Sequence, residues 1–224
     1  MARQLSFDLP VRAALGREDF FVSPANAEAV GMVEGWQGWP SRKLVLTGPA
    51  GAGKTHLAHV WAGLSGAEIV AAQDLSGCDI ARLAQGCVVI EDAESVAGGR
   101  GAEDALFHLH NLTLAEGRAL LVTARTPPHL WCLGLPDLAS RLQGTLHTAL
   151  GPPDDALLSA VLMKLFADRQ LMPSPDTIPY LARRMERSFR AAEDVVADLD
   201  ATALAQRRPI TRALAAQVLD NRGE

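Results

Sequence analysis

The sequence predicts an α/β protein, with a mainly parallel sheet and flanking helices, followed by a smaller all-helical region. Five apolar segments bounded by turn residues are expected to be strands, at residues 43–48, 67–72, 87–92, 119–124 and 145–150. Helical patterns at 55–64 and 102–117 lie between them. This alternation indicates crossover connections, which make neighbouring strands parallel. After Gly151 only helix patterns follow, at 155–170, 177–186, 189–207 and 212–221.

The expected domain limits follow from this layout. We assign residues 1–19 to a leader, 20–151 to the α/β domain and 152–224 to the helical domain. Asp154, Ser188 and Thr211 each precede a late helix pattern and are expected to cap it. A further helix is expected from about Ala25, and the segment AGGRG at 97–101 is expected to be a flexible loop.

Composition excludes several classes of protein. The chain has 224 residues and a net charge of −5, which disfavours a protein that coats nucleic acid, although a local basic patch remains possible. Its three cysteines are scattered, which indicates neither a disulfide framework nor a zinc site. No apolar run approaches the length of a membrane span. We therefore expect a cytoplasmic protein that does not contact a membrane.

The segment GPAGAGKT has the spacing G-x-x-x-x-G-K-[ST] and stands between an expected strand and an expected helix. Glycines let the backbone curl so that its N–H groups point at phosphate oxygens, and the helix adds its positive end. The lysine would reach the β- and γ-phosphates and the threonine hydroxyl would ligate Mg²⁺. The predicted nucleotide-binding residues are Gly48, Pro49, Ala50, Gly51, Ala52, Gly53, Lys54 and Thr55.

Acidic residues follow the strand expected at 87–92. Glu91 and Asp92 come at its end, where carboxylates would face the phosphates and hold Mg²⁺ or orient water. Which of the two is the main metal ligand is left open, and Glu94 follows close by. Thr123, in LLVTART, could hydrogen-bond the γ-phosphate or the attacking water, and an ordinary buried threonine is an equally good interpretation.

Several segments together resemble the DnaA family of AAA+ ATPases. The P-loop with its flanks, LVLTGPAGAGKTHLAHVWA, is similar to that family's. His56, directly after the motif, is included in the predicted nucleotide site, although a packing or surface role is the favoured interpretation of both His56 and His59. FFVSPANAEAV is similar to the family's entry segment near the adenine, which places Phe21 and Val22 there. LLVTARTPPHLWCLGLPDLASRL resembles the sensor-1 strand and the segment that carries the arginine finger. Within the family, LGLPDLASRL is most similar to the Hda-like regulatory inactivators, and the resemblance runs from about Phe20 onward.

The resemblance implies roles for two arginines. Arg141, in LASRL, matches the arginine finger, which reaches the nucleotide of a neighbouring subunit. Arg190, in ERSFRAAEDVV, matches the sensor-2 arginine, which contacts nucleotide bound to its own chain. The helical region also holds Arg183, Arg184 and Arg187, so Arg190 could instead belong to an ordinary basic surface.

Two departures from the initiators shape the functional expectation. Glu91 stands where the initiator usually has aspartate, which puts intrinsic hydrolysis in doubt. The sequence stops at Glu224, where the expected lid ends and the initiator would continue into its DNA-reading domain. On that basis we expect a regulator of the initiator.

The leader contains QLSFDL, which places large apolar residues at alternate positions. An edge strand is one interpretation. The other is a peptide of the kind that docks on the sliding clamp, the β subunit of DNA polymerase III, as in Hda-like proteins. With the rest of the resemblance, clamp docking is favoured, through Gln4, Leu5, Ser6, Phe7 and Leu9.

The resemblance therefore implies an Hda-like negative regulator of replication initiation. It would bind ADP or ATP with Mg²⁺, dock on the clamp and stimulate hydrolysis of DnaA-bound ATP through Arg141. It would contact DNA only indirectly, through its partners, and a homo-oligomer is possible. The alternatives are a free-standing P-loop ATPase or helicase loader and, less favoured, a small-molecule kinase.

Overall fold

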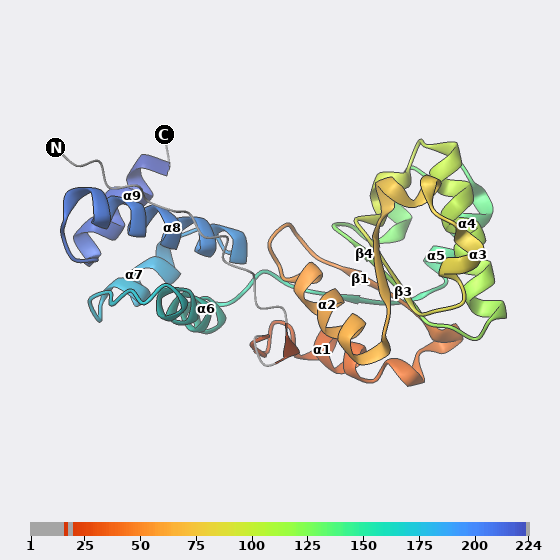
Figure 1. Cartoon of the computed structure of the whole chain (residues 1–224), viewed down its shortest axis with the longest axis horizontal. Helices are drawn as coiled ribbons and strands as arrows, with labels where there is room; N and C mark the ends of the chain where they lie inside the picture. The colour runs from red at the N-terminus through yellow and green to blue at the C-terminus, as the bar shows by residue number, and fades with distance from the viewer. Residues whose placement is uncertain (1–15, 18–19, 223–224) are drawn as a thin grey trace.

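The computed structural model describes residues 16–17 and 20–222 (Figure 1). The expected clamp-docking peptide, Gln4–Leu9, lies outside these residues. Helices α6–α9 gather at one end of the molecule, and the sheet lies with α1–α5 at the other end.

The sheet has five strands in the order β2-β3-β4-β1-β5. All its pairings are parallel, which confirms the predicted fold class. All five expected strand segments form strands, with limits a residue or two shorter than expected. Their bounds are β1 Lys43–Thr47, β2 Glu68–Ala71, β3 Val88–Glu91, β4 Leu120–Ala124 and β5 Leu146–Ala149.

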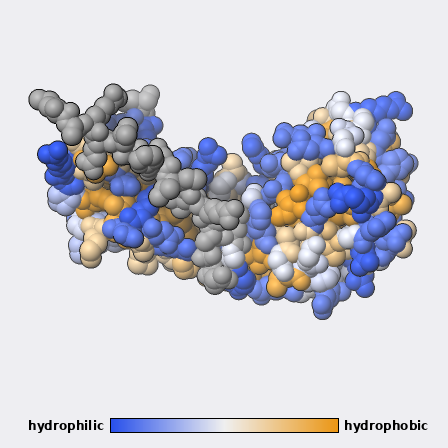
Figure 2. Space-filling model, in the orientation of Figure 1, coloured by the Kyte–Doolittle hydropathy of each residue, from blue (hydrophilic) through white to orange (hydrophobic). Residues whose placement is uncertain are grey.

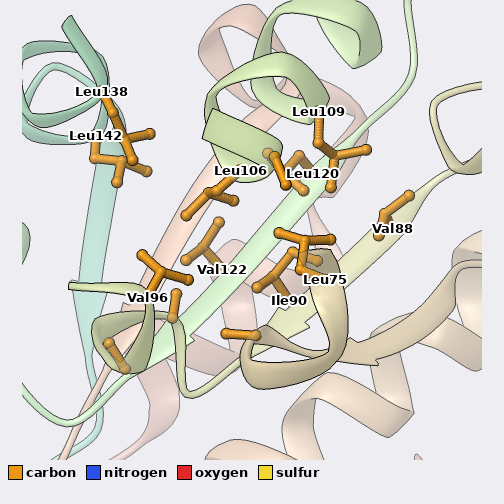
Figure 3. Close-up of a cluster of buried hydrophobic side chains, with 14 of the residues drawn as sticks. Leu75, Val88, Ile90, Val96, Leu106, Leu109, Leu120, Val122, Leu138 and Leu142 are labelled. Atoms are coloured by element: carbon orange, nitrogen blue, oxygen red, sulfur yellow. The ribbon is translucent and has the colours of Figure 1, made fainter. Parts of the chain in front are cut away.

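Helices cover both faces of this sheet. Successive residues of a strand point to opposite sides, so buried strands present apolar side chains on both faces. Leu44 and Leu46 of β1 pack in one apolar cluster with α1 and α2, whereas Val45 packs in the other cluster with α3, α4 and α5. Figure 3 shows that second cluster, where side chains of α4 and α5 meet those of the strands. The helices are α1 Ala27–Glu34, α2 Lys54–Ser65, α3 Ile80–Leu83, α4 Arg100–Ala115 and α5 Pro136–Gln143.

Short 3₁₀ helices complete this part of the chain. They are η2 Trp36–Gly38, η3 Pro40–Arg42, η4 Ala72–Gly77, η5 Ala93–Val96 and η6 Pro128–Leu130. The expectation of a loop over 97–101 was partly wrong, because α4 already begins at Arg100. The helix α5 was not predicted, although proline at its first position is a typical helix start.

The C-terminal helices have an apolar cluster of their own, which includes Leu158, Leu181, Val196 and Leu214. These helices are α6 Asp155–Asp168, α7 Thr177–Arg184, α8 Phe189–Gln206 and α9 Arg212–Arg222. The expected caps are present. Asp154 accepts a hydrogen bond from the Leu157 N–H at 2.7 Å, and Ser188 accepts one from the Ala191 N–H at 3.1 Å. Thr211 accepts a longer one, at 3.4 Å, from the Leu214 N–H.

On the face shown in Figure 2, hydrophilic side chains are interspersed with apolar ones at both ends of the molecule. None of the helices within residues 20–222 is long and apolar enough to cross a membrane.

Candidate nucleotide-binding site

The predicted phosphate loop leaves the end of β1 and leads directly into α2. Gly51 and Gly53 have φ angles of +70° and +94°, a left-handed conformation that a residue with a Cβ adopts only at a cost. Gly53 stands immediately before the first residue of α2, Lys54. The loop therefore curls in front of a helix N-terminus, which is the arrangement that binds phosphate.

Lys54 is held inside the curl of this loop. Its side-chain ammonium donates hydrogen bonds to the carbonyl oxygens of Gly48 at 2.8 Å and of Pro49 at 3.0 Å. Only 8% of the residue is exposed. Burial lowers the pKa of Lys54, and the carboxylates of Asp92 and Glu94 oppose this effect. The site therefore holds a cation close to acidic side chains.

The acidic side chains line a cavity of about 390 Å³ at the end of β3. Its lining includes Glu91, Asp92, Glu94 and Arg125. Glu94 Oε1 accepts a hydrogen bond from the Arg125 N–H at 2.9 Å. Glu91 Oε1 and Glu94 Oε2 are buried without a hydrogen-bond partner among the described residues. Buried carboxylate oxygens without partners are costly, so these atoms are suited to receive a metal ion or a water molecule.

Thr123 lies on β4, and only 1% of it is exposed. Its hydroxyl oxygen accepts a hydrogen bond from the Asp92 N–H at 3.3 Å. Asp92 itself has a φ of +51°, so the bond joins Thr123 to a turn of unusual conformation. The hydroxyl hydrogen of Thr123 is still available to donate. Thr123 therefore contacts the acidic turn directly, and an additional contact with phosphate stays a prediction.

The residues present fit a nucleotide with Mg²⁺. Thr55 is exposed in the first turn of α2, and carboxylates are present at the end of β3. Within residues 16–17 and 20–222, no group of three or more His, Cys, Asp or Glu side chains could hold a metal alone. Mg²⁺ in phosphate sites is usually held by one or two protein ligands together with phosphate oxygens and water. The donor set matches that pattern.

The start of α8 packs against the phosphate loop. The Phe189 N–H donates to the carbonyl oxygen of Gly51 at 2.9 Å. A Cβ placed on Gly51 would lie 2.7 Å from Ser188 Cβ and 3.5 Å from the backbone nitrogen of Arg190. Glycine at 51 is therefore required for this close approach as well as for its φ. The Arg190 side chain, which is exposed, starts beside the loop.

Two aromatic residues at this junction were missed in the sequence. A Cβ on Gly53 would lie 2.9 Å from the Phe189 ring and 3.6 Å from the Phe20 ring. Phe20 is 5% exposed and meets the His56 ring edge-on, with 5.0 Å between centroids. Phe189 adjoins the predicted Arg190, a sequence signal that could have identified it.

The other predicted contacts around the loop are less direct. The His56 ring nitrogen Nε2 lies 3.0 Å from the Gly16 carbonyl oxygen, an arrangement that fits the packing role. Phe21 is half-buried, and its carbonyl oxygen accepts a hydrogen bond from the Asn26 side chain at 2.9 Å. Val22 is 49% exposed. Their contact with adenine stays a prediction.

Arg141 lies far from this loop. It is exposed on α5, and its guanidinium carbon is 5.5 Å from the centroid of the Phe107 ring on α4. Burial, with a smaller contribution from the positive charge of Arg141, lowers the pKa of Lys43 to about 8. The helix α5 leads into the start of β5, where Leu146 pairs with Leu44 near the beginning of β1. The phosphate loop follows the other end of β1, roughly 16 Å away along a five-residue strand. The structure therefore brings together the loop, the carboxylates, Thr123 and the start of α8, and leaves Arg141 at the opposite end of the sheet.

Comparisons with known proteins point to one group. The chain is 29% identical over 136 residues to the chromosomal replication initiator protein DnaA of Thermomicrobium roseum. That match covers 59% of this chain and 28% of the initiator, so it spans well under half of that relative's length. No family model matches the chain.

Solved structures extend the likeness to the fold. Domain III of the Thermotoga maritima replication initiation protein DnaA superposes with a TM-score of 0.80 at 18% identity, over 95% of this chain and 98% of that one. AMPPCP-bound DnaA from Aquifex aeolicus gives a TM-score of 0.70 at 16% identity, over 82% of this chain and 64% of that one. A DnaA bound to AMPPCP and single-stranded DNA gives a TM-score of 0.73 at 16% identity, over 84% of this chain and 65% of that one. By sequence and by fold, the chain is similar to the DnaA-family AAA+ proteins, and its architecture is that of DnaA domain III.

Proposed function

We propose that this chain binds ADP or ATP with Mg²⁺ and acts as an Hda-like negative regulator of DNA replication initiation. In this role it docks on the sliding clamp and stimulates hydrolysis of ATP bound to DnaA. The observation that carries the proposal is the position of Arg141, exposed at the end of the sheet opposite the chain's own phosphate loop. A cation in that position is available to a second protein and not to the chain's own nucleotide.

The chain's own site would hold the nucleotide through several groups. The N–H groups of the loop and the ammonium of Lys54 would bind the phosphates. Thr55 and one of Glu91 and Asp92 would ligate Mg²⁺, which neutralises phosphate charge when bound. Arg190, which starts beside Gly51, would bring a second positive charge to the phosphates. The nucleotide would then link the loop to α8 and act mainly as a structural switch.

The action on DnaA would depend on Arg141. A guanidinium that reaches the γ-phosphate of a neighbouring subunit stabilises charge in the transition state and can be worth about 10³–10⁵ in rate. The Phe107 ring lies beneath this guanidinium and favours one position for it. Arg141 would complete the hydrolytic site of DnaA, which would leave that initiator bound to ADP.

Clamp docking would concentrate the regulator on DNA that carries a loaded clamp. It rests on the sequence QLSFDL alone, in which Leu5, Phe7 and Leu9 alternate with polar residues. An extended peptide of this kind can place its apolar side chains in a groove while the Gln4 amide hydrogen-bonds at the rim. Both proposed partners belong to the cytoplasm.

The central experiment measures hydrolysis of ATP pre-bound to DnaA, with and without this protein on DNA-loaded clamp. We expect stimulation by the wild type and loss of most of it in Arg141→Ala. Arg100→Ala is the matched control, because the Arg100 side chain is 95% exposed on α4 and is paired with Asp104 only at 4.0 Å. Equal stimulation by Arg141→Ala and the wild type would rule out the arginine-finger role.

Docking is measured separately, by calorimetric titration of the protein into purified clamp. The wild type should bind saturably and the Gln4→Ala/Leu5→Ala variant should not. Identical binding by both would remove the leader from the proposal and leave the role of Arg141 to be judged alone.

A free-standing ATPase is the second candidate. It is favoured by the carboxylates Glu91, Asp92 and Glu94, which lie near Lys54 of the chain's own loop, and by the contact of Thr123 with Asp92. It predicts substantial turnover by the protein alone, abolished in Lys54→Ala. Weak turnover alone, combined with stimulation of DnaA, would favour the regulator.

A further inference from the structure

A second cavity, of about 410 Å³, lies among the C-terminal helices. It is lined by Asp176, Pro179, Tyr180, Arg183, Arg184 and Arg212. These residues come from α7, the residue before it and the first position of α9. None of them belongs to the phosphate loop or to the acidic cavity at β3. We call this group the α7/α9 pocket.

Tyr180 organises the positive charge of the pocket. Guanidinium carbons lie 5.5 Å from the centroid of its ring for Arg184 and 5.1 Å for Arg212. Attraction to the ring can hold two like-charged groups near one another. Tyr180 is partly buried, so this platform is fixed by packing. The two guanidiniums are thus placed together before any ligand arrives.

Within the part of the chain that the structure describes, the arginines of the pocket are not paired with carboxylates. Across the described residues, Arg183, Arg184 and Arg212 make no ion pair, whereas Arg187 and Arg222 do. The one acidic residue of the pocket, Asp176, accepts a hydrogen bond from the Ser174 hydroxyl at 2.7 Å instead. Three arginines and one carboxylate leave the pocket with an excess of positive charge in a chain of net charge −5, which indicates a site for an anion.

We propose that the α7/α9 pocket binds the phosphodiester backbone of a nucleic acid strand. Guanidinium groups match phosphate oxygens through paired N–H donors, and they do so better than an ammonium does. The loop between α8 and α9 adds Arg207 and Arg208, both exposed, shortly before Arg212. This loop is held beside the pocket, because the Ser174 N–H donates to the Ile210 carbonyl at 2.9 Å. Positive charge therefore extends beyond one phosphate, which favours a polymer over a single anion.

The proposal goes beyond the function proposed above, in which the protein contacts DNA only through its partners. It requires neither Arg141 nor the leader. A protein that fails to stimulate DnaA could still bind nucleic acid through these arginines, so the two proposals fail separately.

The test measures fluorescence anisotropy of labelled oligonucleotides of about 20 nucleotides, single-stranded and duplex, over a range of salt concentrations. Saturating ADP and Mg²⁺ keep the phosphate loop occupied. The pocket variant is Arg184→Gln/Arg212→Gln, and the matched control is Arg100→Gln/Arg118→Gln, which removes two exposed charges elsewhere. We expect saturable wild-type binding, about tenfold weaker in the pocket variant, with a log–log salt slope reduced by about 1 to 2. The control should retain the wild-type slope.

Tyr180 variants separate binding from folding. Tyr180→Phe keeps the ring and should bind as the wild type does, whereas Tyr180→Leu should bind more weakly with an unchanged circular dichroism spectrum. The relative affinity for single strand and duplex then identifies the preferred form of the backbone.

Several outcomes would overturn the proposal. One is an absence of saturable binding by the wild-type protein, and another is a loss of affinity in the control as large as that in the pocket variant. Displacement of the oligonucleotide by polyglutamate of equal charge, as effective as by unlabelled oligonucleotide, would identify an acidic protein segment as the ligand. Equally effective displacement by inorganic phosphate would identify a site for a single anion.

Discussion

Lys54 has to exchange its partners when a nucleotide binds. Its ammonium now contacts the carbonyl oxygens of Gly48 and Pro49, and phosphate oxygens would replace them. A hydrogen bond to a charged group contributes about 1.5–3 kcal/mol, which corresponds to roughly 10- to 150-fold in affinity. We expect Lys54→Ala to weaken ADP binding by that factor, as measured by calorimetry. His59→Ala, an exposed change on the same helix, should leave the affinity unaltered, and equal affinities for all three proteins would exclude Lys54 from the site.

The position of Arg141 should depend on the ring beneath it. A cation over an exposed aromatic ring gains about 0.5–1 kcal/mol, so Phe107→Leu should reduce stimulation of DnaA by about two- to fivefold. Phe107→Tyr keeps the ring and should restore wild-type stimulation. The affinity of the protein for its own nucleotide should be the same in all three. A loss shared by the tyrosine variant would argue against the ring as the cause.

The location and the backbone conformation of the phosphate loop were predictable, because the motif that defines them occupies consecutive positions, from Gly48 to Thr55. The Phe107–Arg141 contact was not, because these residues are far apart in the chain and only the packing of α5 on α4 brings them together. The same holds for Phe20, which meets Gly53 only after the sheet and α2 have formed.

At the scale of elements, Glu103 ties α4 to the start of α5. Its carboxylate is 3% exposed and accepts hydrogen bonds from the N–H groups of Gly98 at 2.9 Å, Gly134 at 3.0 Å and Leu135 at 2.8 Å. Burial alone would raise the pKa of Glu103, but the three N–H donors lower it below its usual range. The carboxylate therefore fixes the segment that leads into the helix of Arg141.

This tie predicts a dependence on pH. Because the pKa of Glu103 is lower in the folded state than in the unfolded state, its ionised carboxylate stabilises the fold. This contribution is fully present above the pKa of an unfolded glutamate, about 4.3. It is lost as the pH falls through the pKa of the folded state. Glu103→Gln should lower the free energy of unfolding by about 1–3 kcal/mol at neutral pH, because an amide cannot accept all three bonds. Urea denaturation should show this difference shrinking as the pH is lowered below about 4. Glu116→Gln, at the exposed end of α4, is the control, and a constant deficit down to pH 3 would contradict the assignment.

Element types were predictable where the pattern was strong. The five strands were expected because continuous Val, Ile and Leu runs are typical of strands buried on both faces, and the caps Asp154 and Ser188 follow from local hydrogen bonding. The short helices α3 and α5 carry too few apolar positions for periodicity to reveal them. The start of α4 was misjudged because glycines on both sides of Arg100 favour a loop, whereas packing against η4 and η5 favours helix.

At the scale of the whole molecule, the parallel topology was predictable because strand and helix alternate along the chain. The junction between α8 and the phosphate loop was not. Gly51 and Phe189 are distant in sequence, and no local pattern indicates that one will hydrogen-bond to the other. The resemblance to known proteins supplied the expectation that Arg190 lies near nucleotide, and the structure places its backbone beside the loop.

The Phe189–Gly51 hydrogen bond makes one amide a reporter for the whole molecule. This proton exchanges with solvent only when α8 separates from the loop or the helices unfold, so its protection measures how often the two ends part. Hydrogen–deuterium exchange should show slower exchange at Phe189 with saturating ADP, while amides inside α9 stay unchanged. If ADP slows exchange equally at Phe189 and inside α9, the nucleotide stabilises the chain as one unit, and α8 does not separate from the loop independently.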